Sequence, residues 1–208
     1  RYQIPTASLQ TPEWAQVLLV PGSGNLLVIG EGGEIRRSTD DGATWAAVAS
    51  GTTSTLRHVT AGPKETLVAV GSGGGIVRSA NGGATWAAVA SGTQRDLFYV
   101  AAGPKETLVA VGGIGTIVRS TDGGASWAAV ASGTPSDLRH VMAGPKETLV
   151  AVGDEGSIVR STDGGETWAA VVSGTRSALW HVMTGPKEML LAVGGIGTIV
   201  RSTDGGAS

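Results

Sequence analysis

Apolar residues along this chain come in short runs, and turn residues separate one run from the next. In the second quarter of the chain the runs cover 56–60, 66–70, 75–79 and 85–90, with Gly, Pro, Lys, Asn and Ser between them. Runs of five or six residues rich in Val, Ile, Leu and Thr predict strands joined by tight turns. Helical spacing is not sustained long enough anywhere to predict a helix. The pattern therefore predicts an all-β protein.

The runs belong to a sequence repeat with a fixed period. The serines that open the repeated motif are 41 residues apart along the chain, at Ser38, Ser79, Ser120, Ser161 and Ser202. Each unit holds four short strands, so a blade of about 40 residues is repeated five times. This arrangement predicts a five-bladed β-propeller, with a β-solenoid as the alternative.

The repeated units indicate a single domain that covers residues 1–208. We place the blades at about 14–50, 55–91, 96–132, 137–173 and 178–208. The last unit stops before its outermost strand, while residues 1–12 precede the first unit. Ile4 lies 41 residues before Trp45, so residues 2–8 fall in the register of the missing strand. We expect this N-terminal segment to pair with the last blade and close the ring, which would cover an open sheet edge.

Composition narrows the candidate functions. The 208 residues carry a formal charge of −2 and contain 34 glycines and no cysteine. A nearly neutral chain gives no electrostatic reason to expect a nucleic-acid partner or a membrane surface. Without cysteine there is neither a disulfide framework nor a thiolate metal site. We predict no cofactor and no metal.

The repeated motif is Ser-x-Asp-x-Gly-x-Thr/Ser-Trp, known as the Asp-box or BNR repeat. Complete copies end at Trp45, Trp127 and Trp168, and the copy that ends at Trp86 has Asn81 in place of Asp. The longer form Gly-Thr-Ile-Val-Arg-Ser-Thr-Asp-Gly-Gly, at 115–124 and 197–206, resembles the repeats of photosystem II stability/assembly factor propellers. The resemblance implies a non-catalytic binding or scaffold module, and a secreted or periplasmic location.

The box residues are expected to be structural. The Ser hydroxyl and the carboxylate can hydrogen-bond the backbone of the hairpin between the third and fourth strands, and the Trp can bury a large area. A metal site would not tolerate the loss of charge at Asn81. The predicted structural residues are Asp40, Asn81, Asp122, Asp163, Asp204, Trp45, Trp86, Trp127 and Trp168.

The units differ from one another mainly in two kinds of connection. One runs from the outermost strand of a unit to the innermost strand of the next unit, and the other runs from the second to the third strand within a unit. Both are expected at one end of the propeller, here called the variable end; the box hairpins lie at the opposite, constant end. Loops and strand ends on a rigid scaffold are where binding residues lie. The alternative is drift at unconstrained positions. The predicted binding residues are Trp14, Gln16, Arg57, His58, Phe98, Tyr99, Arg139, His140, Trp180 and His181.

These positions form two rows on the innermost strands. We align Gln16 with Arg57, Phe98, Arg139 and Trp180, and Val17 with His58, Tyr99, His140 and His181. Arginine and aromatic residues are typical of binding hot spots. The three histidines could share a metal or an anion, or could line a wet channel, which is the reading we favour.

Catalysis is not expected, and we predict no catalytic residues. A sialidase would need, by resemblance to that class, an arginine triad, a Tyr/Glu pair and an acidic Asp. The tyrosines here are Tyr2 and Tyr99, and no Glu near Tyr99 breaks the repeat. We predict a monomeric module that binds a protein or peptide at the variable end. The alternative is a lectin-like module that binds a glycan, and a sialidase-like hydrolase is a remote alternative. A fourth possibility is that the repeat was recently amplified or designed and has no ligand.

Overall fold

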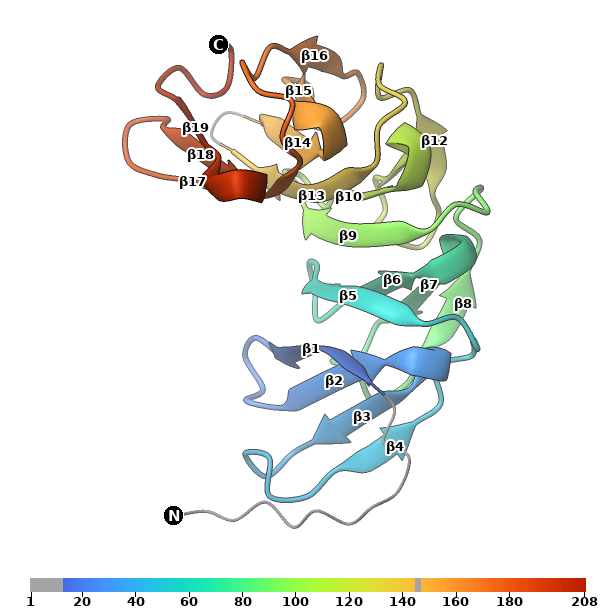
Figure 1. Cartoon of the computed structure of the whole chain (residues 1–208). Coiled ribbons are helices and arrows are strands. Elements are labelled where there is room, and N and C mark those ends of the chain that lie inside the picture. The colour runs from blue at the N-terminus through green and yellow to red at the C-terminus, as the bar shows by residue number, and fades with distance from the viewer. Residues whose placement is uncertain (1–12, 145–146) are drawn as a thin grey trace.

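The computed structural model describes residues 13–144 and 147–208, which form five antiparallel sheets placed side by side in an arc (Figure 1). The first strands of the sheets are β1 (Trp14–Leu19), β5 (Leu56–Ala61), β9 (Leu97–Ala102), β13 (Leu138–Ala143) and β17 (Leu179–Thr184). The second strands are β2 (Leu26–Gly30), β6 (Leu67–Gly71), β10 (Leu108–Gly112), β14 (Leu149–Gly153) and β18 (Leu190–Gly194). The third strands are β3 (Ile35–Ser38), β7 (Ile76–Ser79), β11 (Ile117–Ser120), β15 (Ile158–Ser161) and β19 (Ile199–Ser202). The fourth strands are β4 (Ala46–Val48), β8 (Ala87–Val89), β12 (Ala128–Val130) and β16 (Ala169–Val171).

Each sheet is a meander in which consecutive strands pair, so the expected all-β class and the four-stranded unit are confirmed. The first strands lie innermost, and each of them contacts the first strand of the next sheet. Between the second and third strands the chain makes a 3-10 turn. These turns are η1 (Glu31–Gly33), η2 (Ser72–Gly74), η3 (Gly113–Gly115), η4 (Asp154–Gly156) and η5 (Gly195–Gly197).

The hydrophobic core lies between successive sheets. One cluster joins the first two sheets through residues such as Leu27, Ile29, Leu56 and Leu67, all at most 1% exposed. Three further clusters repeat this arrangement between the second and third, third and fourth, and fourth and fifth sheets. Burying one such side chain stabilises the fold by about 1.5–3 kcal/mol. The interior strands β6, β10 and β14 are buried along their whole length because both of their faces are covered.

The Asp-box hairpins hold the constant end together by the contacts expected from the sequence. In the third box, the Ser120 hydroxyl donates to Asp122 at 2.8 Å and accepts from the Gly124 amide at 2.8 Å. The Asp122 carboxylate also accepts from the hydroxyl and amide of Ser126. These hydrogen bonds, above all the one from the Ser126 side chain, lower the pKa of Asp122 to about 2. The Asn81 amide oxygen accepts from the Ser79 hydroxyl and the Thr85 amide, and its NH2 group donates to the Thr85 hydroxyl, so the uncharged box keeps the same hairpin.

An arginine on the third strand ties each interior sheet to the next box. The Arg78 side chain donates to the Gly123 carbonyl at 2.8 Å, and Arg119 and Arg160 repeat the contact with Gly164 and Gly205. The box tryptophans point the other way. The indole of Trp86 is 9% exposed and packs against the cluster shared with the preceding sheet. Boxes therefore join neighbouring blades as well as closing hairpins.

The described residues form an open arc, not a closed ring. Contacts run from β1 to β5, β9, β13 and finally β17, and the view in Figure 1 leaves the fifth sheet well away from the first. As a result Ile199 is 72% exposed, whereas its repeat equivalent Ile117 is 1% exposed. The expected closure by residues 2–8 lies outside the described residues and stays a prediction.

The first sheet corrects one alignment made from the sequence. In the first sheet Gln16 pairs with Ile29, whereas in the second His58 pairs with Val70. Ile29 and Val70 are repeat equivalents, so Gln16 corresponds in space to His58, and Ala15 corresponds to Arg57. The prediction that aligned Gln16 with Arg57 was wrong by one residue. The connection between β1 and β2 has six residues, 20–25, where the second sheet has five, 62–66, and the extra residue precedes the first serine of the 41-residue spacing.

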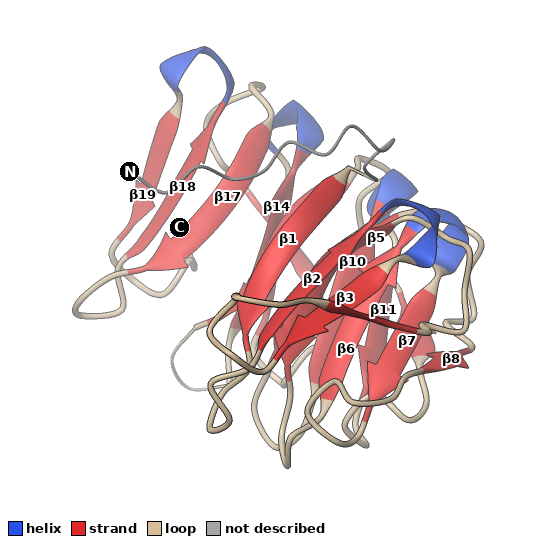
Figure 2. Cartoon of the chain, turned by 90° about the horizontal axis from the view of Figure 1, so that it is seen from below, coloured by secondary structure: helices blue, strands red, loops and turns tan. Residues whose placement is uncertain are grey.

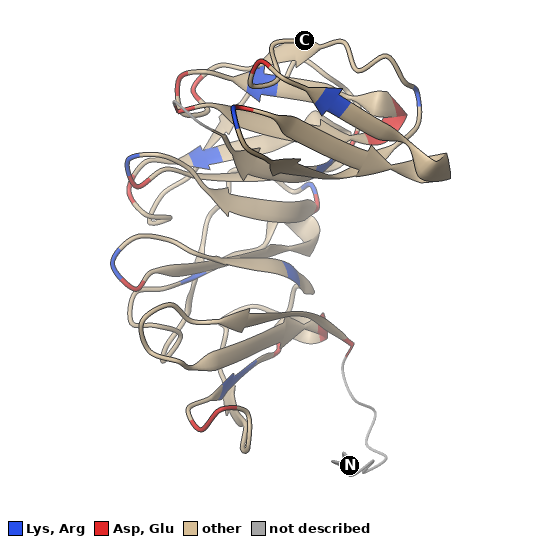
Figure 3. Ribbon diagram, turned by 90° about the vertical axis from the view of Figure 1, so that its left-hand side faces the viewer, with Lys and Arg blue, Asp and Glu red and all other residues tan. Residues whose placement is uncertain are grey.

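The two ends of the sheets are distinct. The 3-10 turns gather at one end of the strands in Figure 2, as expected for the variable end. Charged residues concentrate in turns and at strand ends, and much of each strand between them is free of charge (Figure 3). Within residues 13–144 and 147–208, no helix has the length and apolar character needed to cross a membrane.

Candidate functional site

A β-bulge interrupts the first strand of every sheet close to the variable end. In the second sheet Leu56 pairs with Gly71 and His58 with Val70, which leaves Arg57 as the extra residue. A bulge of this kind turns the extra side chain away from the sheet face and often lies beside binding sites. The extra residues are Ala15, Arg57, Phe98, Arg139 and Trp180.

Four of these bulge residues surround one cavity of about 590 Å³ at the variable end. Phe98 lies between two guanidinium groups: the Cζ atom of Arg57 is 5.6 Å and the Cζ atom of Arg139 is 4.8 Å from the centre of its ring. Trp14, from the first sheet, forms part of the opposite wall. The lining residues are Glu13, Trp14, Ala15, Glu31, Thr55, Arg57, Ser72, Phe98 and Arg139.

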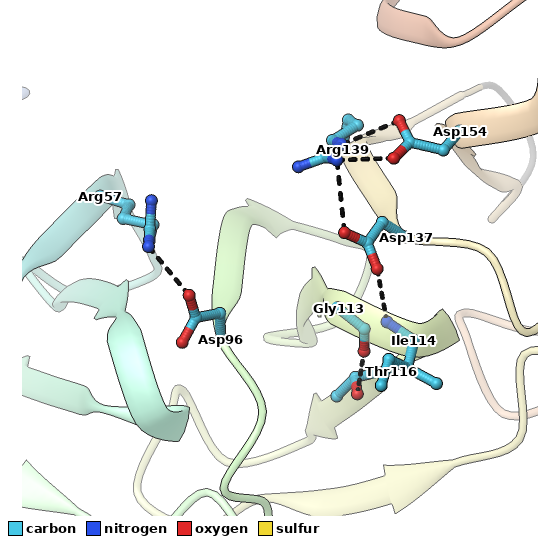
Figure 4. A network of polar contacts seen from close by, with 8 residues as sticks. All are labelled: Arg57, Asp96, Gly113, Ile114, Thr116, Asp137, Arg139 and Asp154. Atoms are coloured by element: carbon cyan, nitrogen blue, oxygen red, sulfur yellow. Dashed lines mark hydrogen bonds and ion pairs between the residues drawn. The ribbon is translucent and has the colours of Figure 1, made fainter.

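Carboxylates from neighbouring connections fix both arginines (Figure 4). Arg57 reaches across to Asp96 at 2.9 Å, and the other oxygen of Asp96 accepts from the Gly73 amide. Arg139 makes a bidentate pair with Asp154, at 3.0 and 2.6 Å, and a further ion pair with Asp137. The hydrogen bond to Asp154 raises the pKa of Arg139 above its ordinary value. The arginines are thus positioned before any ligand arrives.

The cavity and its direct ion partners carry more negative than positive charge. In the ion pairs beside the cavity, the guanidinium groups of Arg57 and Arg139 contact the carboxylates of Asp96, Asp137 and Asp154. The lining adds Glu13 and Glu31, whose carboxylates make no ion pair within the described part of the chain. Five carboxylates against two guanidinium groups make this region favourable for a cation.

A second row of side chains follows the bulges along the innermost strands. The rings of His58, Tyr99, His140 and His181 stack in sequence, with centres 3.6, 4.1 and 4.0 Å apart. Burial lowers the pKa of His58 to about 4 and that of His140 to about 3, the latter with help from the neighbouring histidines. Burial also raises the pKa of Tyr99. His58, Tyr99 and His140 are therefore uncharged at pH 7.

Gln16 begins the same row in the first sheet. Its side-chain oxygen accepts from the Val59 amide at 2.7 Å, just as the His58 ring accepts from the Val100 amide at 3.4 Å. These contacts link β1 to β5 and β5 to β9. They give the second row a role in joining the sheets, in addition to any contact with a ligand.

The structure separates the ten predicted binding residues into three places. Trp14, Arg57, Phe98 and Arg139 line the cavity, while Gln16, His58, Tyr99, His140 and His181 form the second row. Trp180 is a bulge residue of the fifth sheet, 59% exposed, and does not line the cavity. The prediction omitted Glu13, Glu31, Asp96, Asp137 and Asp154. Their sequence signal was their position in connections that vary between units.

The site offers little for catalysis or metal binding. No cluster of three or more His, Asp or Glu able to hold a metal occurs within residues 13–144 and 147–208. Tyr99 is enclosed by two histidine rings, and its raised pKa makes the phenolate harder to form. The carboxylates of Asp96, Asp137 and Asp154 beside the cavity are already paired with arginines. The arrangement can bind charge and aromatic surface.

Comparison of the sequence with protein families gives one match. The family described as photosynthesis system II assembly factor YCF48 matches residues 16–170. None of the curated proteins searched matches the chain.

Similar solved structures share the fold. "YCF48 bound to D1 peptide" superposes with a TM-score of 0.66 at 20% identity, over 88% of this chain and 61% of that one. YCF48 from Cyanidioschyzon merolae gives 0.67 at 16% identity, over 95% and 71%. A streptogramin B lyase gives 0.77 at 18% identity, over 93% and 66%. This chain thus spans about three fifths of the first of these proteins, and enzymes are among those that share its fold.

Proposed function

Because the chain belongs to the photosynthesis system II assembly factor YCF48 family, we propose that it is a non-catalytic module that binds a peptide segment of another protein in the cavity at its variable end. One family member has been solved with a bound peptide. The cavity volume of about 590 Å³ is within the range of small-ligand and side-chain pockets. Arg57 and Arg139 are held by ion pairs, so little ordering of these side chains is needed on binding.

The observation that carries the proposal is the charge of the cavity. Both arginines that could attract an anionic peptide are already paired with aspartates, and Glu13 and Glu31 are not paired within the described residues. The peptide it fits therefore carries a lysine or arginine, whose charge meets Glu13 and Glu31. An apolar or aromatic neighbour in the peptide packs on Trp14 and Phe98.

The experiment is a selection from a displayed library of short peptides, followed by fluorescence polarisation titrations of the enriched sequences. We expect enrichment of a basic residue, and replacement of that residue by Glu should weaken binding at least tenfold. Glu31→Gln should weaken the wild-type peptide about fivefold to tenfold, a change of about 1–1.4 kcal/mol. Glu166→Gln is the matched control, because Glu166 is an exposed glutamate in a box hairpin at the constant end.

Enrichment of acidic peptides, or equal effects of the two Glu→Gln variants, would overturn the proposal. A glycan is the second candidate ligand, because Trp14 and Phe98 provide aromatic surface beside carboxylates in the same cavity. Binding of a neutral oligosaccharide that is lost in Phe98→Ala would establish that candidate in place of a peptide.

A further inference from the structure

Three arginines in or beside the variable-end cavity share one arrangement, in which the guanidinium group lies near an aromatic ring and next to a carboxylate. Arg36 has its Cζ atom 5.4 Å from the centre of the Trp14 ring and its Nε atom 3.7 Å from Glu34. The two arginines that line the cavity combine the Phe98 ring with aspartates in the same way, and their ion pairs are drawn in Figure 4. Ring, carboxylate and guanidinium group therefore occur together three times in this region.

The lysines of the chain are used differently. Lys64 and Lys105 pair with Glu106 and Glu147, at 2.6 and 2.5 Å, in turns at the constant end. Within residues 13–144 and 147–208, every cation found over an aromatic ring is an arginine. The planar guanidinium group can stack on a ring and fork onto a carboxylate at the same time, whereas the compact, strongly hydrated ammonium group of lysine cannot. A ring beside a carboxylate is therefore a site that favours arginine.

The wall of the cavity formed by the first sheet contains a ring between two carboxylates. Glu13 precedes Trp14 in the sequence, and Glu31 follows Gly30, the residue that pairs with Trp14. A Cβ added to Gly30 would lie 3.1 Å from the Trp14 ring, so the indole lies against the backbone next to Glu31. The Glu31 amide also donates to the Glu13 carbonyl at 3.2 Å. Both glutamates line the cavity beside Trp14, and neither makes an ion pair within the described residues.

The Trp14 ring remains accessible from the cavity. Arg36, which lies over this ring, is not among the residues that line the cavity, whereas Trp14 itself is. The part of the indole that borders the cavity is therefore not the part that Arg36 covers. Phe98 shows that one ring in this region can contact two guanidinium groups. A second cation can thus reach Trp14 from the cavity, where its attraction to the ring adds to that of the glutamates.

We infer that the cavity binds an arginine of the partner peptide in preference to a lysine, with the guanidinium group stacked on Trp14 and hydrogen-bonded to Glu13 and Glu31. The inference rests on the proposed function and names the residue that the peptide supplies. Phe98 is then left for the apolar neighbour of that arginine. A charge-assisted, bidentate contact with a carboxylate is available to a guanidinium group and not to an ammonium group. Methylation of the arginine keeps its charge but blocks this contact, so the same site distinguishes a methylated partner from an unmodified one.

The test uses the full chain and the peptide enriched from the displayed library, synthesised in four forms that differ only at the basic position. The four residues are arginine, lysine, asymmetric dimethylarginine and citrulline, which has nearly the shape of arginine but no charge. Fluorescence polarisation should rank the arginine form tightest. The lysine and dimethylarginine forms should bind about fivefold to tenfold more weakly, and the citrulline form at least about tenfold more weakly.

A variant of the chain tests the role of the ring. Trp14→Leu keeps an apolar side chain but removes the stacking surface, so the arginine and lysine forms should then bind within about twofold of each other. Trp180→Leu is the matched control, because Trp180 is a tryptophan of the variable end that does not line the cavity, and it should leave the preference for arginine unchanged. If Trp14→Leu folds poorly, the four peptides still decide the question on the unaltered chain.

The outcomes separate this inference from the proposed function. Equal affinity of the arginine and lysine forms, or tighter binding of the lysine form, would overturn the inference and leave a cavity that binds basic peptides. A preference for arginine that persists in Trp14→Leu would overturn the stacking on Trp14. Enrichment of acidic peptides from the library would overturn the proposed function and this inference together.

Discussion

The two ends of each blade are built from turns of the same repeats, yet their contacts differ in kind. At the constant end, Ser, Asp and Gly of one box bond one another within a few residues, and the pattern recurs in every unit. The variable end also has repeated short-range bonds, such as the one from the Ser132 hydroxyl to the Thr134 carbonyl. In addition, Arg57 pairs with Asp96 and Arg139 with Asp154, 39 and 15 residues away, and each of these two ion pairs occurs once. Short-range repeated contacts maintain the fold. Contacts between neighbouring loops are free to change, which allows a binding surface to form there.

The largest expected loss of stability comes from a substitution at the constant end. Gly124 has φ of +84°, and a Cβ added there would lie 2.7 Å from a methyl of Val68 in the preceding sheet. Gly124→Ala should destabilise the protein by about 3 kcal/mol, from left-handed backbone strain and overpacking together. Gly133→Ala, at φ of +77° with no atom within 4 Å, should cost about 1 kcal/mol. Urea unfolding of both variants measures the difference; equal losses would contradict it.

The next effect compares two serine hydroxyls. Ser120, 1% exposed, bonds Asp122 and the Gly124 amide, so Ser120→Ala leaves the buried Gly124 amide without its partner and should cost about 2 kcal/mol. Ser136 at the variable end bonds the exposed Glu155, and Ser136→Ala should change stability by less than about 0.5 kcal/mol. Unfolding midpoints in urea give both values. A larger loss for Ser136→Ala would reverse the contrast between the ends.

The third effect concerns the pH dependence of stability, which the histidines of the second row are expected to cause. The pKa of His140 falls from 6.5 to about 3 on folding, so the unfolded chain binds the proton first. Stability should be constant above pH 6.5 and should fall below it by about 1.4 kcal/mol per pH unit for this histidine. His58 adds to the fall down to about pH 4. His140→Phe keeps a ring in the stack and should reduce the slope of unfolding free energy against pH; an unchanged slope would contradict the account.

The smallest effect on stability is expected in the ion pairs of the cavity. Arg139 and Asp154 are each about one third exposed, so Arg139→Met should cost less than about 1 kcal/mol. The same variant leaves Asp137 and Asp154 without their arginine partner, so on the charge argument it should strengthen binding of the basic peptide. Thermal unfolding and a binding titration on one preparation separate the two quantities. Weaker binding of the basic peptide to this variant would contradict the charge argument.

Sequence reasoning gave the strands, the blade unit and the box contacts because these depend on residues close together in one unit. The register of the first sheet was wrong because a shift of Gln16 by one residue leaves the 41-residue spacing of the serines unchanged. The arrangement of sheets in an arc depends on the angle between packed sheets, which no single unit encodes.

The site was harder to predict than the fold. Arg57, Phe98 and Arg139 were identified by residue type and by their variation, but their common cause, the bulge, appears only in strand pairing. The alignment placed Tyr99 in one row with His58 and His140, but the contacts between their rings appear only in the fold. Asp96, Asp137 and Asp154 were in variable connections, yet only the fold brings them onto arginines, and the site then carries more negative than positive charge.

Hydrogen–deuterium exchange with and without the selected basic peptide tests the central claim most directly. The account predicts slower exchange in the segments that carry Glu13, Trp14, Glu31, Arg57 and Phe98, with box hairpins unchanged. Protection confined to the box hairpins, or spread equally over both ends, would contradict a binding site at the variable end.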